Sequence, residues 1–200
     1  MTPAALADLI RDKATGHAGR FIVAIAGPPA SGKTTLARDL QRHLGAGARV
    51  VAMDGFHYDD AVLTAQGHLA RKGAPHTFDV AGLRHCLERI RAGDTVAIPV
   101  FDRQLELSRA AADVVLPTDR IILVEGNYLL LDAEPWSGLA AMFDVRILLR
   151  ASEAVLTARL LARWQHYGRA DGPDRVRTND LPNARTVLTQ STGADLVLDH

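Results

Sequence analysis

Segments typical of strands and of helices alternate along this chain of 200 residues, which predicts a three-layer α/β fold. The strand-like segments are short and almost continuously apolar, as in parallel strands that are buried on both faces. Several segments between them repeat apolar residues at the spacing of an amphipathic helix. We therefore expect a mainly parallel sheet of about five strands flanked by helices, formed as one domain over residues 1–200.

Five apolar segments are expected to be the strands of this sheet: residues 20–26, 49–53, 95–101, 120–126 and 143–149. Weaker patterns predict a short hairpin piece at 114–117 and a last edge strand at 196–198. The sequence from 54 to 79 is polar and rich in glycine. Such a long stretch inside a compact domain is usually functional.

Helices are expected where capping residues precede apolar repeats. Thr2 is suited to the N-cap of a helix at the start of the chain. Leucine recurs every four positions from 36 to 44, and a second stripe ends at Gly93, a good C-terminal glycine. Ser152 is expected to cap a long helix that runs to about Tyr167.

The composition limits the classes of partner. Lys plus Arg and Asp plus Glu each number 23, so no net charge points to nucleic acid or to an anionic membrane. Cys86 is the only cysteine, which excludes internal disulfides and a cysteine-built zinc site. With no signal peptide and no apolar run of membrane-spanning length, we expect a cytoplasmic protein. A homodimer is compatible with these features.

A glycine-rich motif follows the first expected strand. Residues 27–34 spell Gly-x-x-x-x-Gly-Lys-Thr, and an amphipathic helix comes directly after them, which is the context that a phosphate-binding loop requires. The two glycines let backbone N–H groups face an anion, Lys33 adds a charge for the outer phosphates, and the Thr34 hydroxyl can ligate Mg²⁺. The alternative is a glycine-rich turn that arose by chance. The predicted nucleotide-binding residues are Gly27, Pro28, Pro29, Ala30, Ser31, Gly32, Lys33, Thr34 and Thr35.

Two acids stand where strands are expected to end beside this loop. In parallel sheets the carboxyl ends of the strands meet at one edge, where ligands bind. Glu125 is suited to hold Mg²⁺ together with Thr34, directly or through water. Asp54 is suited to accept the proton of an attacking hydroxyl as a general base. Taken alone, Asp54 could instead cap a turn and Glu125 could pair with an arginine.

The segment after Asp54 is expected to bind the acceptor of a phosphoryl group. Only three of the 23 Lys and Arg residues are lysines, so the lysine at 72 is more informative than a surface arginine. His57 and Lys72 lie in the polar segment, and Asp102 and Arg103 follow the expected strand at 95–101. Cations mixed with acids suit a polar acceptor such as a sugar, a nucleoside or a hydroxy acid.

A helical lid is expected over about residues 159–183. Arg159 and Arg163 are four residues apart and therefore share a helix face, and a turn-rich segment follows at 167–173. Arginines on such a lid would offset the charge of a phosphoryl group during transfer. A solvated helix face in an arginine-rich chain explains the pattern equally well. Residues 179–183 could approach an adenine, or could simply connect two helices.

Five segments occur together in an order that resembles a known superfamily: residues 27–34, 53–56, 71–79, 99–103 and 124–130. That superfamily is the P-loop small-molecule kinases, which include uridine kinase, phosphoribulokinase and bacterial type I pantothenate kinase. Asp-Gly-Phe followed by Arg-Lys-Gly-x-Pro-x-x-Phe-Asp is most similar to the pantothenate kinases and to short bacterial fructose transport system kinase-like proteins.

The resemblance implies a P-loop NTPase fold that uses ATP and Mg²⁺, with Asp54 as catalytic base, Glu125 as the acid of the Mg²⁺ site and the Lys72 region in the acceptor pocket. The chain departs from both named branches. It is much shorter than pantothenate kinases, and it has Asp-Gly-Phe-His where uridine kinases show Asp-Ser-Phe-Tyr. The resemblance therefore implies the chemistry and leaves the acceptor open.

We therefore expect an ATP-dependent kinase that transfers the γ-phosphoryl group to a hydroxyl of a small polar metabolite, namely a sugar, a nucleoside or a pantothenate-like alcohol. The alternative is a P-loop NTPase or nucleotide-dependent regulatory protein that acts on a protein partner. GTPases usually carry Asn-Lys-x-Asp after a late strand, and no lysine follows Lys72. A non-catalytic nucleotide sensor would leave Asp54 and the Lys72 segment without a role.

Overall fold

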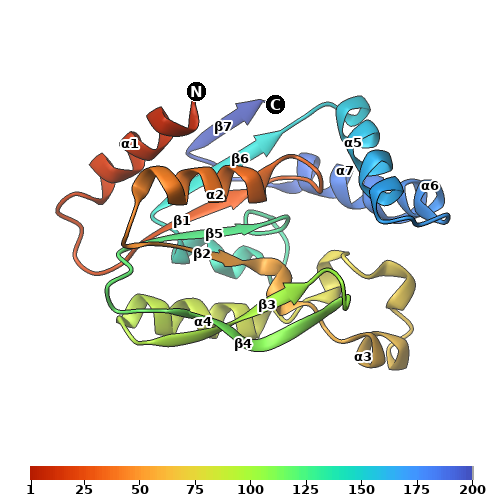
Figure 1. Ribbon diagram of the computed structural model, residues 1–200, viewed down its shortest axis with the longest axis horizontal. Helices are drawn as coiled ribbons and strands as arrows, with labels where there is room; N and C mark the ends of the chain where they lie inside the picture. The colour runs from red at the N-terminus through yellow and green to blue at the C-terminus, as the bar shows by residue number, and fades with distance from the viewer. Residues whose placement is uncertain (200) are drawn as a thin grey trace.

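A central sheet of five parallel strands organises the computed structural model, which describes residues 1–199 (Figure 1). The strands are β1 (Phe21–Ala26), β2 (Ala48–Ala52), β5 (Ile121–Gly126), β6 (Val145–Arg150) and β7 (Leu196–Asp199). They lie in the order β2-β5-β1-β6-β7, so the first strand of the chain is central. The predicted α/β fold with a parallel sheet is confirmed, and the expected last edge strand is β7.

The central strands are buried on both faces, which explains their continuous apolar sequence. Every residue of β1 is buried. Ile22 and Ala24 belong to one hydrophobic core, whereas Val23 and Ile25 belong to the core on the opposite face. This alternation follows from the period of two along a strand.

Helices cover both faces of the sheet (Figure 1). On one face, α1 (Pro3–Ala14) and α2 (Lys33–Leu44) bury residues such as Leu40 against the core. On the other face, α4 (Val80–Ala92) packs through residues such as Leu87. The three layers that the sequence predicts are therefore present.

The predicted helix caps also form. Thr2 Oγ1 accepts a hydrogen bond from the N–H of Ala5 at the start of α1. Gly93 ends α4 with φ of 93°, in the left-handed region that favours glycine. Ser152 Oγ accepts from the N–H of Val155 and begins the helix that follows β6.

The last helices gather at one end of the molecule, beside the carboxyl ends of β1 and β6 (Figure 1). They are α5 (Glu153–His166), α6 (Gly172–Arg175) and α7 (Leu181–Gln190), and a π-helical turn at Val176–Asp180 joins the last two. A π-helical turn is rare and frequently occurs at functional sites. This helical segment includes the region that the sequence assigns to a lid.

The expected strand at 95–101 is not part of the central sheet. It is β3 (Val96–Asp102), which pairs antiparallel with β4 (Leu107–Val115) as a separate hairpin. The expected hairpin piece at 114–117 overlaps the end of β4. Two features explain the difference: Pro99 cannot donate to a strand ladder, and Ala97 is exposed on a face that a central parallel strand would bury.

The polar segment after β2 forms short helical turns instead of one long loop. It contains α3 (Asp60–Ala65) and 3-10 turns at Met53–Phe56, Leu69–Arg71 and Pro75–Thr77, and a further 3-10 turn lies at Ser137–Met142. The turn at Met53–Phe56 packs against the hairpin, because Ser108 Oγ lies 3.5 Å from the carbonyl oxygen of Asp54. The hairpin therefore supports the end of β2 from outside the sheet.

Two further expectations concern Cys86 and the membrane. Cys86 lies on α4, and its side chain is buried in the hydrophobic core, as its position beside the apolar stripe predicts. Within residues 1–199, the helices are too short or too polar to cross a bilayer.

Candidate active site

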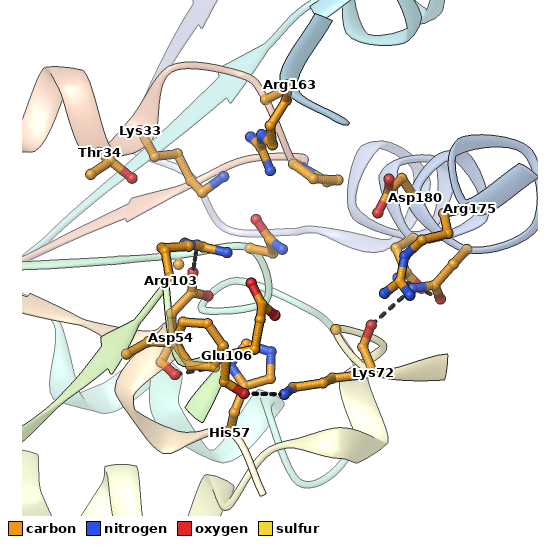
Figure 2. Close-up of a pocket in the computed structure, with 18 of the residues that line it drawn as sticks. Lys33, Thr34, Asp54, His57, Lys72, Arg103, Glu106, Arg163, Arg175 and Asp180 are labelled. Atoms are coloured by element: carbon orange, nitrogen blue, oxygen red, sulfur yellow. Dashed lines mark hydrogen bonds and ion pairs between the residues drawn. The ribbon is translucent and has the colours of Figure 1, made fainter. Parts of the chain in front are cut away.

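The carboxyl ends of β1, β2 and β5 meet at one cleft (Figure 2). The parallel register brings them together, because Glu125 of β5 pairs with Ile25 of β1 on one side and with Ala52 of β2 on the other. The phosphate loop follows Ile25, and Asp54 follows Ala52. Lys33, Asp54 and Glu125 therefore line the same cleft.

The loop at 27–34 is shaped to hold an anion. A Cβ added at Gly27 would lie 2.8 Å from both the Leu149 carbonyl oxygen and Ser31 Oγ, so only glycine fits there. Gly32 takes φ of 95° at the start of α2, which also favours glycine. Ser31 Oγ is buried and has no hydrogen-bond partner within residues 1–199. Its hydroxyl fits a phosphate oxygen, as do the N–H groups of the helix start.

Lys33 folds back over this loop. Its Nζ donates to the Pro28 carbonyl oxygen at 2.8 Å, and the side chain is buried. Burial lowers the pKa of Lys33 to about 8, although the nearby carboxylates of Glu125 and Asp54 oppose that shift. A phosphate chain beside the ammonium would stabilise its charge and so offset the effect of burial.

Thr34 and Glu125 form a small oxygen site that suits Mg²⁺. Thr34 Oγ1 donates to Glu125 Oε1 at 3.0 Å. Burial and the neighbouring Asp54 carboxylate raise the pKa of Glu125, so a cation at this point would be favourable. The described residues hold no cluster of three or more His, Cys, Asp or Glu side chains that could bind a metal by themselves. Mg²⁺ usually takes one or two carboxylates together with substrate phosphates, so Thr34 and Glu125 would hold it beside a bound nucleotide.

Asp54 faces the phosphate loop from the opposite wall of the cleft (Figure 2). Its Oδ2 forms an ion pair with Arg103. Burial acts to raise the pKa of Asp54, but the charges of Arg103, His57 and Lys33 outweigh it and leave the pKa below its ordinary value. The carboxylate is therefore ionised at neutral pH and can accept a proton.

Gly55 is required because the chain passes very close to the hairpin. A Cβ at this position would overlap the Pro99 carbonyl group, which is backbone and cannot move aside cheaply. We expect Gly55→Ala to destabilise the fold by about 1–3 kcal/mol, the usual cost of overpacking, and to displace Asp54. Thermal unfolding measures the first effect and steady-state turnover the second.

The matched control is Gly138→Ala. A Cβ there meets only the far end of the Arg84 side chain, at 2.8 Å from Nη2, which can rotate away. Equal stability losses for the two variants would contradict the close approach of residue 55 to the hairpin.

His57, Lys72, Phe101 and Arg103 form a second wall of the cleft, which we call the acceptor wall. Lys72 Nζ donates to Asp60 Oδ1 at 2.5 Å and to the Glu106 carbonyl oxygen at 2.6 Å. The Lys72 side chain is only 10% exposed, so it points into the molecule and not to bulk solvent. Of the four acceptor residues expected from the sequence, the structure brings three to this wall.

Asp102 is the expected acceptor residue that the structure does not bring to the cleft. Its Oδ1 accepts from the backbone N–H groups of Gln104 and Leu105, and its Oδ2 pairs with Arg109. The side chain therefore shapes the tip of the hairpin. The expectation failed because β3 leaves the central sheet, so the residue after Phe101 does not end at the sheet's carboxyl edge.

The two arginines that the sequence assigns to a lid, Arg159 and Arg163, differ in their distance from the cleft. Arg163 lines the cleft, and its charge is close enough to Lys33 to act on the pKa of that ammonium (Figure 2). Arg159 is exposed and lies outside the cleft lining, although its Nη1 donates to the Ala30 carbonyl oxygen at 3.4 Å. Arg163 is therefore the better placed to reach a bound phosphate.

Trp164 and Arg175 of the cleft have no role in the sequence-based expectations, whereas Asn179 and Asp180 belong to the segment 179–183 that could approach an adenine. Trp164 Nε1 donates to Asp180 Oδ2 at 2.7 Å, and the Arg175 guanidinium stacks on the Trp164 ring at 4.8 Å. Asn179 Nδ2 donates to the Lys72 carbonyl oxygen at 2.8 Å and so ties the helical segment to the acceptor wall. The sequence carries a signal for Asn179 and Asn183, because these two asparagines stand four apart in a helical pattern and helix interiors disfavour asparagine.

Comparisons with known proteins agree with this geometry. A family model described as an AAA domain, AAA_18, matches residues 23–180. Escherichia coli (strain K12) has a protein named "Uncharacterized protein YggC" that is 35% identical over 188 residues, covering 90% of this chain and 78% of that protein. Schizosaccharomyces pombe has one named "Putative uridine kinase C227.14", 31% identical over 200 residues and covering 92% of this chain and 85% of that protein.

A solved structure is also similar over nearly its whole length. It comes from Silicibacter sp. TM1040, is described as a "putative fructose transport system kinase", and superposes with a TM-score of 0.93 at 41% identity, covering 98% of each chain. The phosphate loop and the parallel sheet define a P-loop nucleotide-binding protein. The chain belongs to the AAA domain family that matches it, and it is a P-loop small-molecule kinase.

Proposed function

We propose that this kinase transfers the γ-phosphoryl group of ATP to a hydroxyl group of a small polar metabolite. The observation that carries the proposal is the position of Asp54, which faces Lys33 across one cleft (Figure 2). A hydroxyl hydrogen-bonded to Asp54 would face a phosphate held by the loop. The alcohols in the names of the similar proteins differ, so the acceptor is defined here only by its chemistry.

In this proposal the residues of the cleft have separate roles. The loop N–H groups, Ser31 and Lys33 hold the outer phosphates, while Thr34 and Glu125 hold Mg²⁺. When bound there, Mg²⁺ would neutralise negative charge on the phosphates. The acceptor oxygen bonds to the γ-phosphorus as the bond from that phosphorus to the bridging oxygen breaks, and the hydroxyl proton passes to Asp54. Arg163 offsets charge on the group being transferred.

The test is a screen of ADP release. Purified protein is supplied with ATP and Mg²⁺, with and without a library of alditols, aldoses, ketoses, nucleosides, hydroxy acids and simple monohydroxy alcohols. We expect slow release in water alone and a strong increase with one chemical group of polar alcohols. A rate that no alcohol changes would contradict the proposal and favour a nucleotide-dependent regulator.

Lys72 provides a separate test of the acceptor wall. We expect Lys72→Ala to raise KM for the acceptor found in the screen by about 10- to 100-fold, the range for losing a hydrogen bond to a charged group. The affinity for ATP should not change, since the contacts of Lys72 within residues 1–199 are with Asp60, Glu106 and Phe101, which lie outside the loop. Steady-state kinetics with each substrate varied in turn measures both effects.

The control for charge is Lys13→Ala, because Lys13 is exposed on α1, away from the cleft. If Lys72→Ala lowers only the thermal stability and leaves KM as it was, Lys72 supports the hairpin tip and does not contact the acceptor.

A further inference from the structure

The imidazole of His57 is held in one orientation on the acceptor wall. Its ring packs against Phe78, with the centroids 4.0 Å apart, and against Phe101, with the centroids 4.9 Å apart. Figure 2 shows the ring at the base of the cleft, between Asp54 and Lys72. These contacts with Phe78 and Phe101 restrict the movement of the imidazole.

The hydrogen bonding of this ring fixes its tautomer. Nδ1 lies 2.8 Å from the carbonyl oxygen of Asp54. A carbonyl oxygen only accepts, so Nδ1 carries the proton and donates. Burial lowers the pKa of His57, even though Asp54 opposes that shift, so the ring is neutral at pH 7. In a neutral imidazole that is protonated on Nδ1, Nε2 presents a lone pair.

Nε2 is the free polar atom of this ring. It has no hydrogen-bond partner within residues 1–199, and His57 lines the cleft. The carboxylate of Asp54 lines the same cleft and also only accepts when it is ionised. The cleft therefore offers two hydrogen-bond acceptors, the Asp54 carboxylate and Nε2 of His57, to donors on a ligand.

We propose that His57 determines specificity: its Nε2 accepts a hydrogen bond from a second hydroxyl of the acceptor, so the substrates are polyols and not monohydroxy alcohols. The inference rests on the proposed kinase function and deepens it. The phosphorylated hydroxyl donates to Asp54, and a neighbouring hydroxyl donates to His57. His57 is half-buried, and an alcohol that lacks the second hydroxyl leaves Nε2 without a donor from the ligand. Sites that hydrogen-bond a substrate hydroxyl discriminate against analogues that lack it.

The tautomer can be tested without any substrate. Nitrogen-15 NMR of histidine-labelled protein distinguishes a protonated from an unprotonated ring nitrogen, and His57→Asn assigns the His57 signals by their loss. We expect a protonated Nδ1 and an unprotonated Nε2 in the wild-type protein at pH 7. The opposite tautomer, or a doubly protonated ring, would overturn the proposal.

The specificity is tested with matched pairs of alcohols. 1,2-Propanediol is compared with 1-propanol, and D-glycerate with 3-hydroxypropionate, so that the second compound of each pair has a single hydroxyl. For wild-type protein we expect kcat/KM to fall by roughly 10²–10⁴-fold when the second hydroxyl is absent.

Two variants separate the hydrogen bond from packing. His57→Asn keeps a donor for the Asp54 carbonyl oxygen and removes Nε2, so it should lose most of the preference for polyols. His57→Gln places an amide oxygen near Nε2 and should restore part of it. His76→Asn, on the exposed part of the same segment, is the control and should behave as wild type.

The outcomes are distinguishable. If wild-type protein phosphorylates polyols and monohydroxy alcohols equally, or if His57→Asn keeps the full preference, this inference is wrong while the kinase function stands. If no alcohol stimulates ADP release, the proposed function itself is wrong and the inference falls with it. Thermal unfolding of each variant confirms that the kinetic effect does not come from loss of the fold.

Discussion

Lys33→Ala is expected to lower kcat/KM for ATP by about 10³-fold, because a clamp on transferring phosphates acts in the transition state. The fold should remain intact. Within the described residues 1–199, the Lys33 ammonium bonds only to the Pro28 carbonyl oxygen, and its burial costs desolvation that alanine does not incur. Single-turnover kinetics with the screened acceptor measures the chemical step, and thermal unfolding reports the fold.

Lys13→Ala is again the control, since it removes an equal charge from the surface. Lys33→Arg adds a sharper comparison. It keeps the charge but brings a larger planar group into a loop where Lys33 is buried, so it should also lose most activity. Tight binding of Mg·ATP together with undiminished turnover in Lys33→Ala would overturn the assignment of the phosphate loop.

The part of the site that depends on the parallel sheet could be predicted from the sequence. Glu125 and the phosphate loop lie next to each other because β1 and β5 are adjacent strands with a fixed register. The apolar runs indicate such strands, and the position of their last residues then follows. Asp54 could be placed for the same reason, because β2 lies on the other side of β5.

The rest of the cleft depends on features that a single sequence does not specify. The apolar sequence of β3 predicts a strand of the central sheet, and Asp102 was therefore expected in the cleft. Because β3 instead forms a hairpin outside the sheet, Asp102 caps the hairpin tip. Arg103, the next residue, reaches Asp54 from that same hairpin. The contact of Asn179 with the Lys72 carbonyl joins residues 107 apart in the chain. No local periodicity encodes such long-range packing.

Asp54 forms an ion pair with Arg103, so a substitution at Asp54 changes both the base and the position of the guanidinium. We expect Asp54→Asn to lower kcat by roughly 10²- to 10⁴-fold, the usual contribution of a general base, while the affinity for ATP changes little. The pKa of Asp54 lies below its ordinary value of 3.8, since Arg103, His57 and Lys33 outweigh the effect of burial. A base must be deprotonated, so this group causes no loss of activity as the pH falls from 8 to 5. Turnover measured across that range, with nucleotide affinity by calorimetry, checks both statements.

A double-mutant cycle shows whether Asp54 acts directly or only by holding Arg103. If the carboxylate served only to position the guanidinium, Arg103→Ala would slow the reaction as much as Asp54→Asn, and the double variant would be no slower than either. We expect instead that Arg103→Ala retains more activity, because the carboxylate remains in place to accept the proton. Asp39→Asn, which removes an acid from α2 where Asp39 pairs with Arg42, is the control for charge. A collapse of ATP binding in Asp54→Asn, with normal turnover per bound complex, would show that Asp54 serves the metal or the fold and is not the base.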